Sequence, residues 1–262
     1  MSGNVVNLKK PAARRINRGR GHSYTLDGSP VMGVTTILSK GYPKPALVGW
    51  AAREVAEFVA GRREVLTQLN DEELVDLCKG APYRTRDAAA NRGTEVHKLA
   101  ERLARGDEVD VPEEVAGHVD AYLAFLEAFK PSAALVERPV FNRKYRYGGT
   151  MDMLARTDEM GWTLFDIKTS GSGIYGDIAL QMAAYGNAEV YIDSDGDEQP
   201  MPEVDSYAAI WVRADGYSVY PIDVTEKEFK AFLYVQQIAF WLEHRSDQVK
   251  GDEIWRRESV KA

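Results

Sequence analysis

Two carboxylates and a lysine lie close together in "GGTMDMLARTDEMGWTLFDIKTS", residues 148–170. Asp166 and Lys168 are two positions apart, so in a β-strand they share one face. Asp152 belongs to the preceding strand, and a turn over residues 158–161 brings it alongside Asp166. Neighbouring carboxylates repel unless a cation lies between them, and their oxygens suit Mg²⁺ or Mn²⁺. The pattern predicts a metal-dependent hydrolytic site in which Lys168 orients or deprotonates water and offsets negative charge.

A lone D-x-K sequence is more often a surface ion pair in a hairpin, so the interpretation depends on other parts of the chain. His97 in "RGTEVH" lies at the edge of the buried stripe of a predicted helix. Such a histidine is usually structural, although imidazole is also a common metal ligand. Gln181 and Tyr185 in "QMAAY" are four residues apart and share one helical face, which by itself indicates a half-buried polar edge.

The N-terminal half is predicted to hold an arm, a hairpin and a helical lobe. Residues 1–22 form a basic, flexible arm without acidic residues, which either contacts phosphates or is simply solvated. Residues 22–38 read as a hairpin that turns at Asp27-Gly28, with β-branched residues on the returning strand. Residues 44–130 form a lobe of several helices, the first beginning near Pro45 and the last ending before Pro131.

The C-terminal half is predicted to form a sheet with two helices. Its apolar residues follow a strand-like period over about 134–142, 145–155 and 161–168. "DIALQMAAYGNAEVY" returns to helical spacing, "SYAAIWVRADGYSVYPI" is a hairpin turning at Asp215-Gly216, and "TEKEFKAFLYVQQIAFWLEHR" is an amphipathic helix. The resulting order is helix, three strands, helix and further strands.

His97 in R-G-T-x-x-H, Asp152 in G-G-T-M-D, Asp166-Ile167-Lys168 and Gln181-x-x-x-Tyr185 occur in one order. This order resembles the RecB-like branch of the PD-(D/E)XK nuclease superfamily, and "GVTTIL…KPALVGWAA" is similar to phage-type exonucleases of that branch. The resemblance covers residues 23–190. It implies an α/β fold with a restriction-endonuclease-like core, a mixed sheet flanked by helices in the order αβββαβ, and an N-terminal helical lobe. Residues 23–262 would form one nuclease domain.

The resemblance also implies roles for individual residues. His97, Asp152, Asp166 and the Ile167 carbonyl would bind metal, Lys168 would be the catalytic lysine, and Gln181 and Tyr185 would line the site. Glu137 is a candidate supporting acid, with a plain surface residue as the even alternative. Asp177 is expected to cap the helix that carries Gln181. Candidate DNA contacts are Arg84, Arg86, Arg92, Thr169 and Ser170, the arginines having solvation as their alternative role.

Composition limits the other classes of protein. The single Cys78 excludes an internal disulfide framework and the four-cysteine iron–sulfur cluster that some relatives carry. No G-x-x-x-x-G-K-[ST] phosphate loop occurs, so no nucleotide cofactor is expected. No apolar run is long enough to cross a membrane, and we expect a cytoplasmic protein, in the host cytoplasm if phage-encoded. The net charge of −7 argues weakly against a nucleic-acid binder that is basic over its whole surface.

These observations predict a Mg²⁺- or Mn²⁺-dependent DNA exonuclease acting in replication, recombination or repair. The alternatives are a structure-specific endonuclease on the same core, a non-cutting module that binds DNA ends, and an unrelated α/β protein with chance matches. The expected partner is DNA, single- or double-stranded. A single-strand annealing or recombination protein and a second copy of the chain are further candidate partners.

Overall fold

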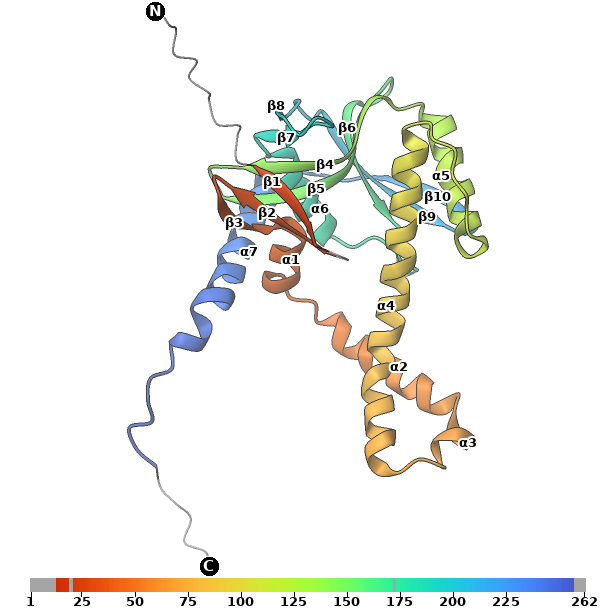
Figure 1. Cartoon of the computed structure of the whole chain (residues 1–262), viewed down its shortest axis with the longest axis vertical. Helices are drawn as coiled ribbons and strands as arrows, with labels where there is room; N and C mark the ends of the chain where they lie inside the picture. Colours follow the sequence, from red (N-terminus) through yellow and green to blue (C-terminus); the bar gives the residue numbers. More distant parts are fainter. Residues whose placement is uncertain (1–12, 19–20, 172, 257–262) are drawn as a thin grey trace, which may run out of the picture.

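The protein has a mixed α/β fold. A computed structural model describes residues 13–18, 21–171 and 173–256, and within them ten strands join in one curled sheet accompanied by seven α-helices (Figure 1). Helices α4 and α5 pack on one face of the sheet, while α1, α6 and α7 pack on the other. The expected α/β class is confirmed.

Five strands form the part of the sheet that carries the predicted site. They are β4 (Ser132–Asn142), β5 (Tyr147–Thr157), β6 (Gly161–Lys168), β9 (Ser206–Arg213) and β10 (Gly216–Pro221). Strands β4, β5 and β6 are antiparallel neighbours, β9 runs parallel to β6, and β10 returns antiparallel to β9. The three expected strands and the Asp215-Gly216 hairpin are therefore confirmed.

Strand β4 has a free edge over much of its length. The short β7 (Val190–Ile192), which pairs with β8 (Glu198–Pro200), contacts β4 only at Val140 and Phe141. In the described part of the chain, residues 132–138 of β4 have no strand neighbour on that side.

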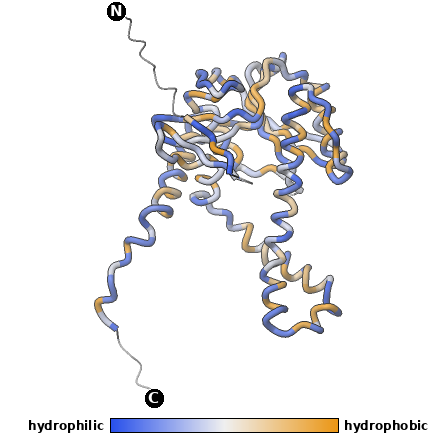
Figure 2. Tube along the Cα trace, viewed as in Figure 1, coloured by the Kyte–Doolittle hydropathy of each residue, from blue (hydrophilic) through white to orange (hydrophobic). Residues whose placement is uncertain are grey.

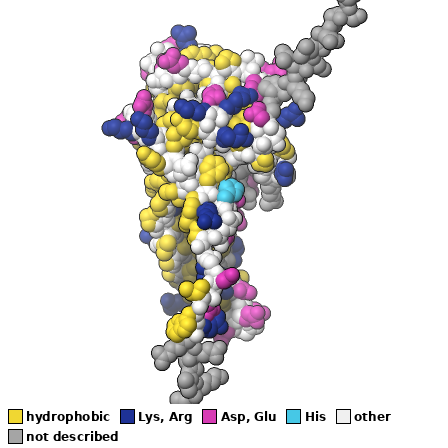
Figure 3. Space-filling model, turned by 90° about the vertical axis from the view of Figure 1, so that its left-hand side faces the viewer, with side chains coloured by type: hydrophobic (Ala, Val, Ile, Leu, Met, Phe, Trp, Pro, Cys, Tyr) yellow, Lys and Arg dark blue, Asp and Glu magenta, His cyan; other side chains and the backbone are white. Residues whose placement is uncertain are grey.

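The N-terminal hairpin is larger than expected. Strands β1 (Arg14–Arg18), β2 (Gly21–Leu26) and β3 (Ser29–Gly33) extend the sheet through β3, which pairs parallel to β5. The Asp27-Gly28 turn is confirmed, but residues 14–18 are a paired strand, so the expectation of a flexible arm over 1–22 is wrong there. Lys9, Lys10 and Arg20 lie outside the described residues. Figure 3 shows the side of the molecule that lies to the left in Figure 1, and Lys and Arg side chains gather on its upper part.

The returning strand of the hairpin was expected to include "VTTIL", which is helical. Helix α1 (Val34–Gly41) begins directly after β3 and buries Val34, Ile37 and Leu38 against the core. The spacing of these residues matches one face of a helix, so burial outweighs the strand preference of the β-branched residues.

The helical lobe is smaller than expected. Helices α2 (Ala46–Ala60) and α3 (Arg63–Leu66) and the first half of α4 (Asp71–Ala104) project from the body, whereas α5 (Ala116–Phe129) packs on β9 and β10 (Figure 1). The lobe therefore does not extend to residue 130. Within the range expected to hold several helices, α4 is one long helix, begun by a capping box between Asn70 and Glu73 and continuous through Pro82. Figure 2 shows hydrophobic residues in the lobe as well as in the body.

Two further helices complete the fold. Helix α6 (Asp177–Gly186) connects β6 to the later strands, and α7 (Glu226–His244) begins with a capping box between Thr225 and Glu228. Among the described helices, none has both the length and the apolar character that a membrane crossing requires.

Candidate metal centre

Three acidic side chains form a row across the three central strands. The pairs Val136↔Met153 and Arg138↔Met151 place Glu137 opposite Asp152 across β4 and β5. Asp166 lies one position beyond the last β5–β6 pair, Met153↔Phe165, and so faces Asp152 from the other side. Like charges on neighbouring strands are unfavourable, so side-chain packing in the sheet does not by itself explain why three acids lie in this row.

The alternation of β6 explains the position of Asp166 and Lys168. Phe165 and Ile167 point into the core under α4 and α5, as expected, while Leu164 packs on the opposite face. Asp166 and Lys168 therefore share the face that is covered by α6, where Asp166 is only 2% exposed.

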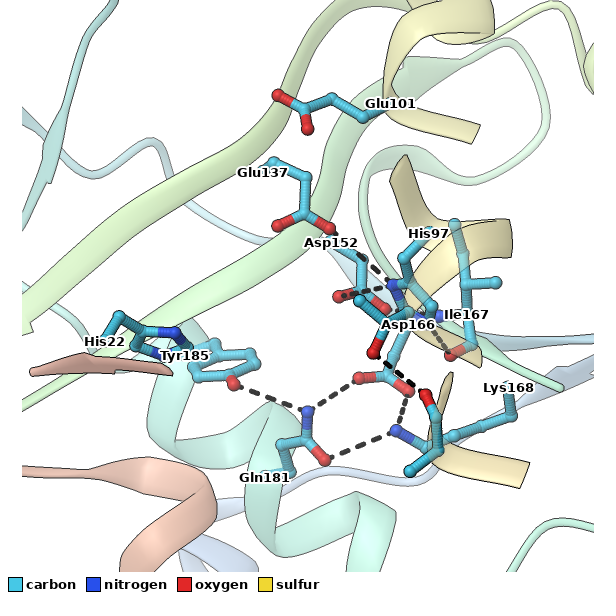
Figure 4. A network of polar contacts seen from close by, with 12 residues as sticks. His22, His97, Glu101, Glu137, Asp152, Asp166, Ile167, Lys168, Gln181 and Tyr185 are labelled. Carbon is cyan, nitrogen blue, oxygen red and sulfur yellow. Dashed lines mark hydrogen bonds and ion pairs between the residues drawn. The ribbon is translucent and has the colours of Figure 1, made fainter. Parts of the chain in front are cut away.

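His97 reaches the row from α4. Its Nδ1 lies 3.6 Å from Glu137 Oε1 and 3.6 Å from Asp152 Oδ1. Its Nε2 lies 3.0 Å from the Ile167 carbonyl oxygen. Because a carbonyl only accepts, Nε2 carries a proton and donates it, which leaves Nδ1 facing both carboxylates (Figure 4).

The charges around His97 decide its protonation. Burial lowers the pKa of His97, but the negative charges of Asp152 and Glu137 outweigh burial and raise it to about 9. Burial has the opposite effect on an acid and raises the pKa of Asp152, while the positive charge of His97 acts to lower it. Without a cation, the protonated imidazole is thus the positive charge between these two carboxylates.

Asp166 and Lys168 form a buried ion pair. Lys168 Nζ lies 2.5 Å from Asp166 Oδ2. Burial lowers the pKa of Lys168, but Asp166 and Asp152 more than compensate, so the pKa is raised and the amine stays charged. Burial raises the pKa of Asp166 to about 6, with Lys168 opposing the increase.

Gln181 and Tyr185 of α6 close the network from below, on one helical face as predicted. Gln181 Nε2 donates to Asp166 Oδ1 over 2.8 Å and lies 3.4 Å from the Tyr185 hydroxyl, and Lys168 donates to Gln181 Oε1 over 3.4 Å (Figure 4). The ring of Tyr185 packs directly on β5 at Gly149, where an added Cβ would overlap ring atom Cε1. The second glycine of "GGTMD" is therefore required by the position of Tyr185.

One cluster of side chains in the described residues has the geometry of a cation site. Ligand atoms of His97, Glu137 and Asp152 all lie within 4.8 Å of one another. Carboxylates and imidazole are both ligands of divalent cations, so the donor set could hold one such ion. Glu137 has a backbone φ of 51°, a left-handed conformation that is strained for this residue type.

This cluster differs from the expected ligand set. Glu137, expected only in support, takes the place expected for Asp166, whose oxygens contact Lys168 and Gln181 instead. The Ile167 carbonyl faces His97 Nε2, while the Ile167 N–H donates to Asp152 Oδ2 over 2.7 Å. The sequence signal for Glu137 was its position on the strand before "GGTMD".

The candidate DNA contacts fall into two groups. Thr169 lies beside α4, where a Cβ on Gly93 would be 3.1 Å from its hydroxyl, and Ser170 accepts a hydrogen bond from Trp211 on its carbonyl. Arg92 is exposed on α4, five residues before His97.

Arg84 and Arg86 are not brought to the site. Arg84 stacks over Phe58 of α2, and Arg86 pairs with Asp87 over 2.8 Å. At 1.5 Å per residue, Arg84 lies about 20 Å along α4 from His97.

The prediction that Asp177 caps α6 is also wrong. Gly176 occupies the N-cap position, and Asp177, the first helical residue, pairs with Lys44 over 3.0 Å.

Comparisons with known proteins add little to this geometry. No protein-family model matches the chain, and no curated protein matches it. Among solved structures, one titled "Crystal structure of SSO0001" is similar at 16% sequence identity, with a TM-score of 0.31 over 60% of this chain and 72% of that chain. A likeness at this level says nothing about function.

Proposed function

We propose that this protein is a Mg²⁺- or Mn²⁺-dependent DNA exonuclease of the RecB-like branch of the PD-(D/E)XK superfamily. The observation that carries the proposal is the row of Glu137, Asp152 and Asp166, joined by His97 at one end and by Lys168 at the other. A structural ion pair between β5 and β6 would need only one acid and one base. The additional, partly buried acids are costly to fold unless a cation is bound.

The order of the elements supports the finer fold assignment. Helices α4 and α5 precede β4, β5 and β6, α6 follows, and β9 then adds parallel to β6. This succession agrees with the proposed αβββαβ core. The assignment of residues 23–262 to one nuclease domain remains a prediction.

The cation would be held by His97, Glu137 and Asp152, with Asp166 and the Ile167 carbonyl as candidate further ligands. When bound, Mg²⁺ or Mn²⁺ supplies Lewis acidity for the phosphate and a more acidic water. His97 would hold the cation through Nδ1, because its Nε2 donates to the Ile167 carbonyl.

Lys168 contributes a positive charge rather than a base. In the metal-free protein its raised pKa keeps the amine protonated at neutral pH. It therefore orients the attacking water and stabilises the negative charge that develops on the phosphate as water attacks in line with the leaving oxygen. Asp166 and Gln181 hold the amine in place for this role.

The proposal is tested with end-labelled linear DNA and closed circular DNA, each incubated with Mg²⁺, Mn²⁺ or chelator. The wild type should degrade only the linear DNA and only with metal, and Asp152→Asn, which keeps the shape of the ligand, should be inactive. Asp158→Asn in the exposed β5–β6 turn is the matched control and should retain wild-type activity.

Other outcomes identify the rivals. Cutting of circular DNA would establish an endonuclease on the same core. Binding of ends without cutting of either DNA would establish a non-cutting module. Loss of activity in the Asp158→Asn control would show that the assay reports general damage rather than the metal centre.

A further inference from the structure

A polar pocket lies between the end of α4 and the free edge of β4. It encloses about 700 Å³ and is lined by Arg105 at the end of α4, Arg138 of β4 and Ser194 of the β7–β8 turn, together with small and apolar residues. Arg138 directly follows Glu137 in the chain, so the pocket and the cation cluster share a stretch of β4.

Helix α4 connects the two sites along one face. His97, Glu101 and Arg105 are spaced four residues apart and so lie above one another on the helix. Figure 4 shows Glu101 beyond Glu137, on the far side of the row from Lys168. The pocket therefore continues the site in the direction opposite to Lys168 and Gln181.

The guanidinium groups leave donors available in this pocket. Arg138 Nε is buried and has no hydrogen-bond partner among the described residues. Arg105 is paired through one terminal nitrogen with Glu101, 2.5 Å away, and its side chain is 44% exposed. A guanidinium has five N–H donors in a planar fork that matches the oxygens of a phosphate.

Irregular backbone along the free edge of β4 makes this edge unsuited to pairing with another strand. Ala133 and Glu137 both have left-handed backbone conformations, with φ of 50° and 51°. These interrupt the regular row of edge donors and acceptors that an added strand would need. Asp193, which precedes Ser194, accepts hydrogen bonds from the Gln199 side chain and from the backbone N–H groups of Asp197 and Asp195. These hydrogen bonds lower its pKa, and the charge of nearby Arg138 helps to lower it.

We propose that the pocket between the end of α4 and the free edge of β4 binds a backbone phosphate of the DNA strand, next to the phosphate at the metal centre. Arg138 and Arg105 would hold it. This inference rests on the proposed nuclease function, and it identifies the side of the metal centre along which the strand runs.

The test measures binding of a short fluorescent single-stranded DNA by anisotropy, in chelator so that no cleavage occurs, over a series of salt concentrations. Arg138→Gln and Arg105→Gln should each raise Kd about tenfold at low salt. Each should also lower the slope of log Kd against log salt by about 0.7, the value for one lost single-strand phosphate contact. Arg245→Gln, an exposed arginine following α7, is the matched charge control and should change neither quantity.

Wild-type Kd and slope in both pocket variants would overturn the inference, and so would an equal change in Arg245→Gln, which would mean a bulk charge effect. If Arg138→Gln unfolds early in a thermal melt, the exposed Arg105→Gln decides. If the wild type cuts linear DNA and both pocket variants bind DNA as the wild type does, the pocket inference fails and the proposed function stands. Wild-type protein that neither binds nor cuts DNA removes both.

Discussion

Glu137 and Asp152 face each other across β4 and β5, and each presents an oxygen 3.6 Å from the same nitrogen, Nδ1 of His97. At these separations the contacts are ion pairs of the protonated imidazole, longer than ordinary hydrogen bonds. A cation between them would bring the two carboxylates and the imidazole into one shell.

Glu137→Gln should weaken Mn²⁺ binding at least about tenfold, because the amide keeps the size of the side chain but removes one anionic ligand. Isothermal titration calorimetry measures the change directly. Glu159→Gln in the exposed β5–β6 turn removes the same charge elsewhere and should bind Mn²⁺ as the wild type does. Equal affinity in the two variants would exclude Glu137 as a ligand.

Mn²⁺ binding should release about one proton at neutral pH. The pKa of His97 is raised to about 9 in the metal-free protein, so the imidazole is protonated at pH 7 and must lose a proton before Nδ1 binds metal. Affinity should therefore rise with pH and level off above about 9. Calorimetry in two buffers of different ionisation enthalpy counts the protons, and His97→Gln should abolish this release. A pH-independent affinity would contradict the role of His97.

Lys168→Gln should reduce cleavage by about 10²- to 10³-fold while Mn²⁺ still binds, because a positioned charge is lost and no proposed ligand is. Lys168→Arg should recover part of the rate, since it restores the charge. Steady-state rates over pH 6–9 test the same point, and the wild type should show no increase in rate from lysine deprotonation. Lys230→Gln, on the exposed side of α7, is the control.

Gly149→Ala should destabilise the protein by about 2 kcal/mol or more, because the new Cβ overlaps the ring of Tyr185, which is buried and cannot move aside. Gly49→Ala is the matched substitution in the exposed part of α2, where no atom lies within 4 Å of the added Cβ. It should stabilise the protein by about 0.5–1 kcal/mol. Chemical denaturation measures both, and equal effects would contradict the packing of Tyr185 on β5.

Local patterns were sufficient to predict the parts of the site that lie on one element or in one hairpin. The alternation of β6 placed Asp166 and Lys168 on one face, and the spacing in α6 did the same for Gln181 and Tyr185. Both follow from the periods of strand and helix.

The exact register between strands and the conformation of individual segments could not be predicted in the same way. The position of Glu137 opposite Asp152 depends on the register of β4 against β5, which is set by the loop between them, including the left-handed Arg146. Residues 34–36 have the composition of a strand, yet their burial against the core makes them helical. The single helix α4 was missed because a proline normally interrupts helical hydrogen bonding.

The length of α4 has a mechanical consequence. One continuous helix carries the projecting lobe at its start and His97 about three quarters of the way along. A displacement of the lobe would therefore be transmitted through the helix to His97. Pro82 removes one backbone hydrogen bond between the two ends, so bending at this residue would reduce the displacement that reaches His97. Contact of DNA or a protein that tilts α4 as a whole would shift the spacing between Nδ1 and the two carboxylates without touching them.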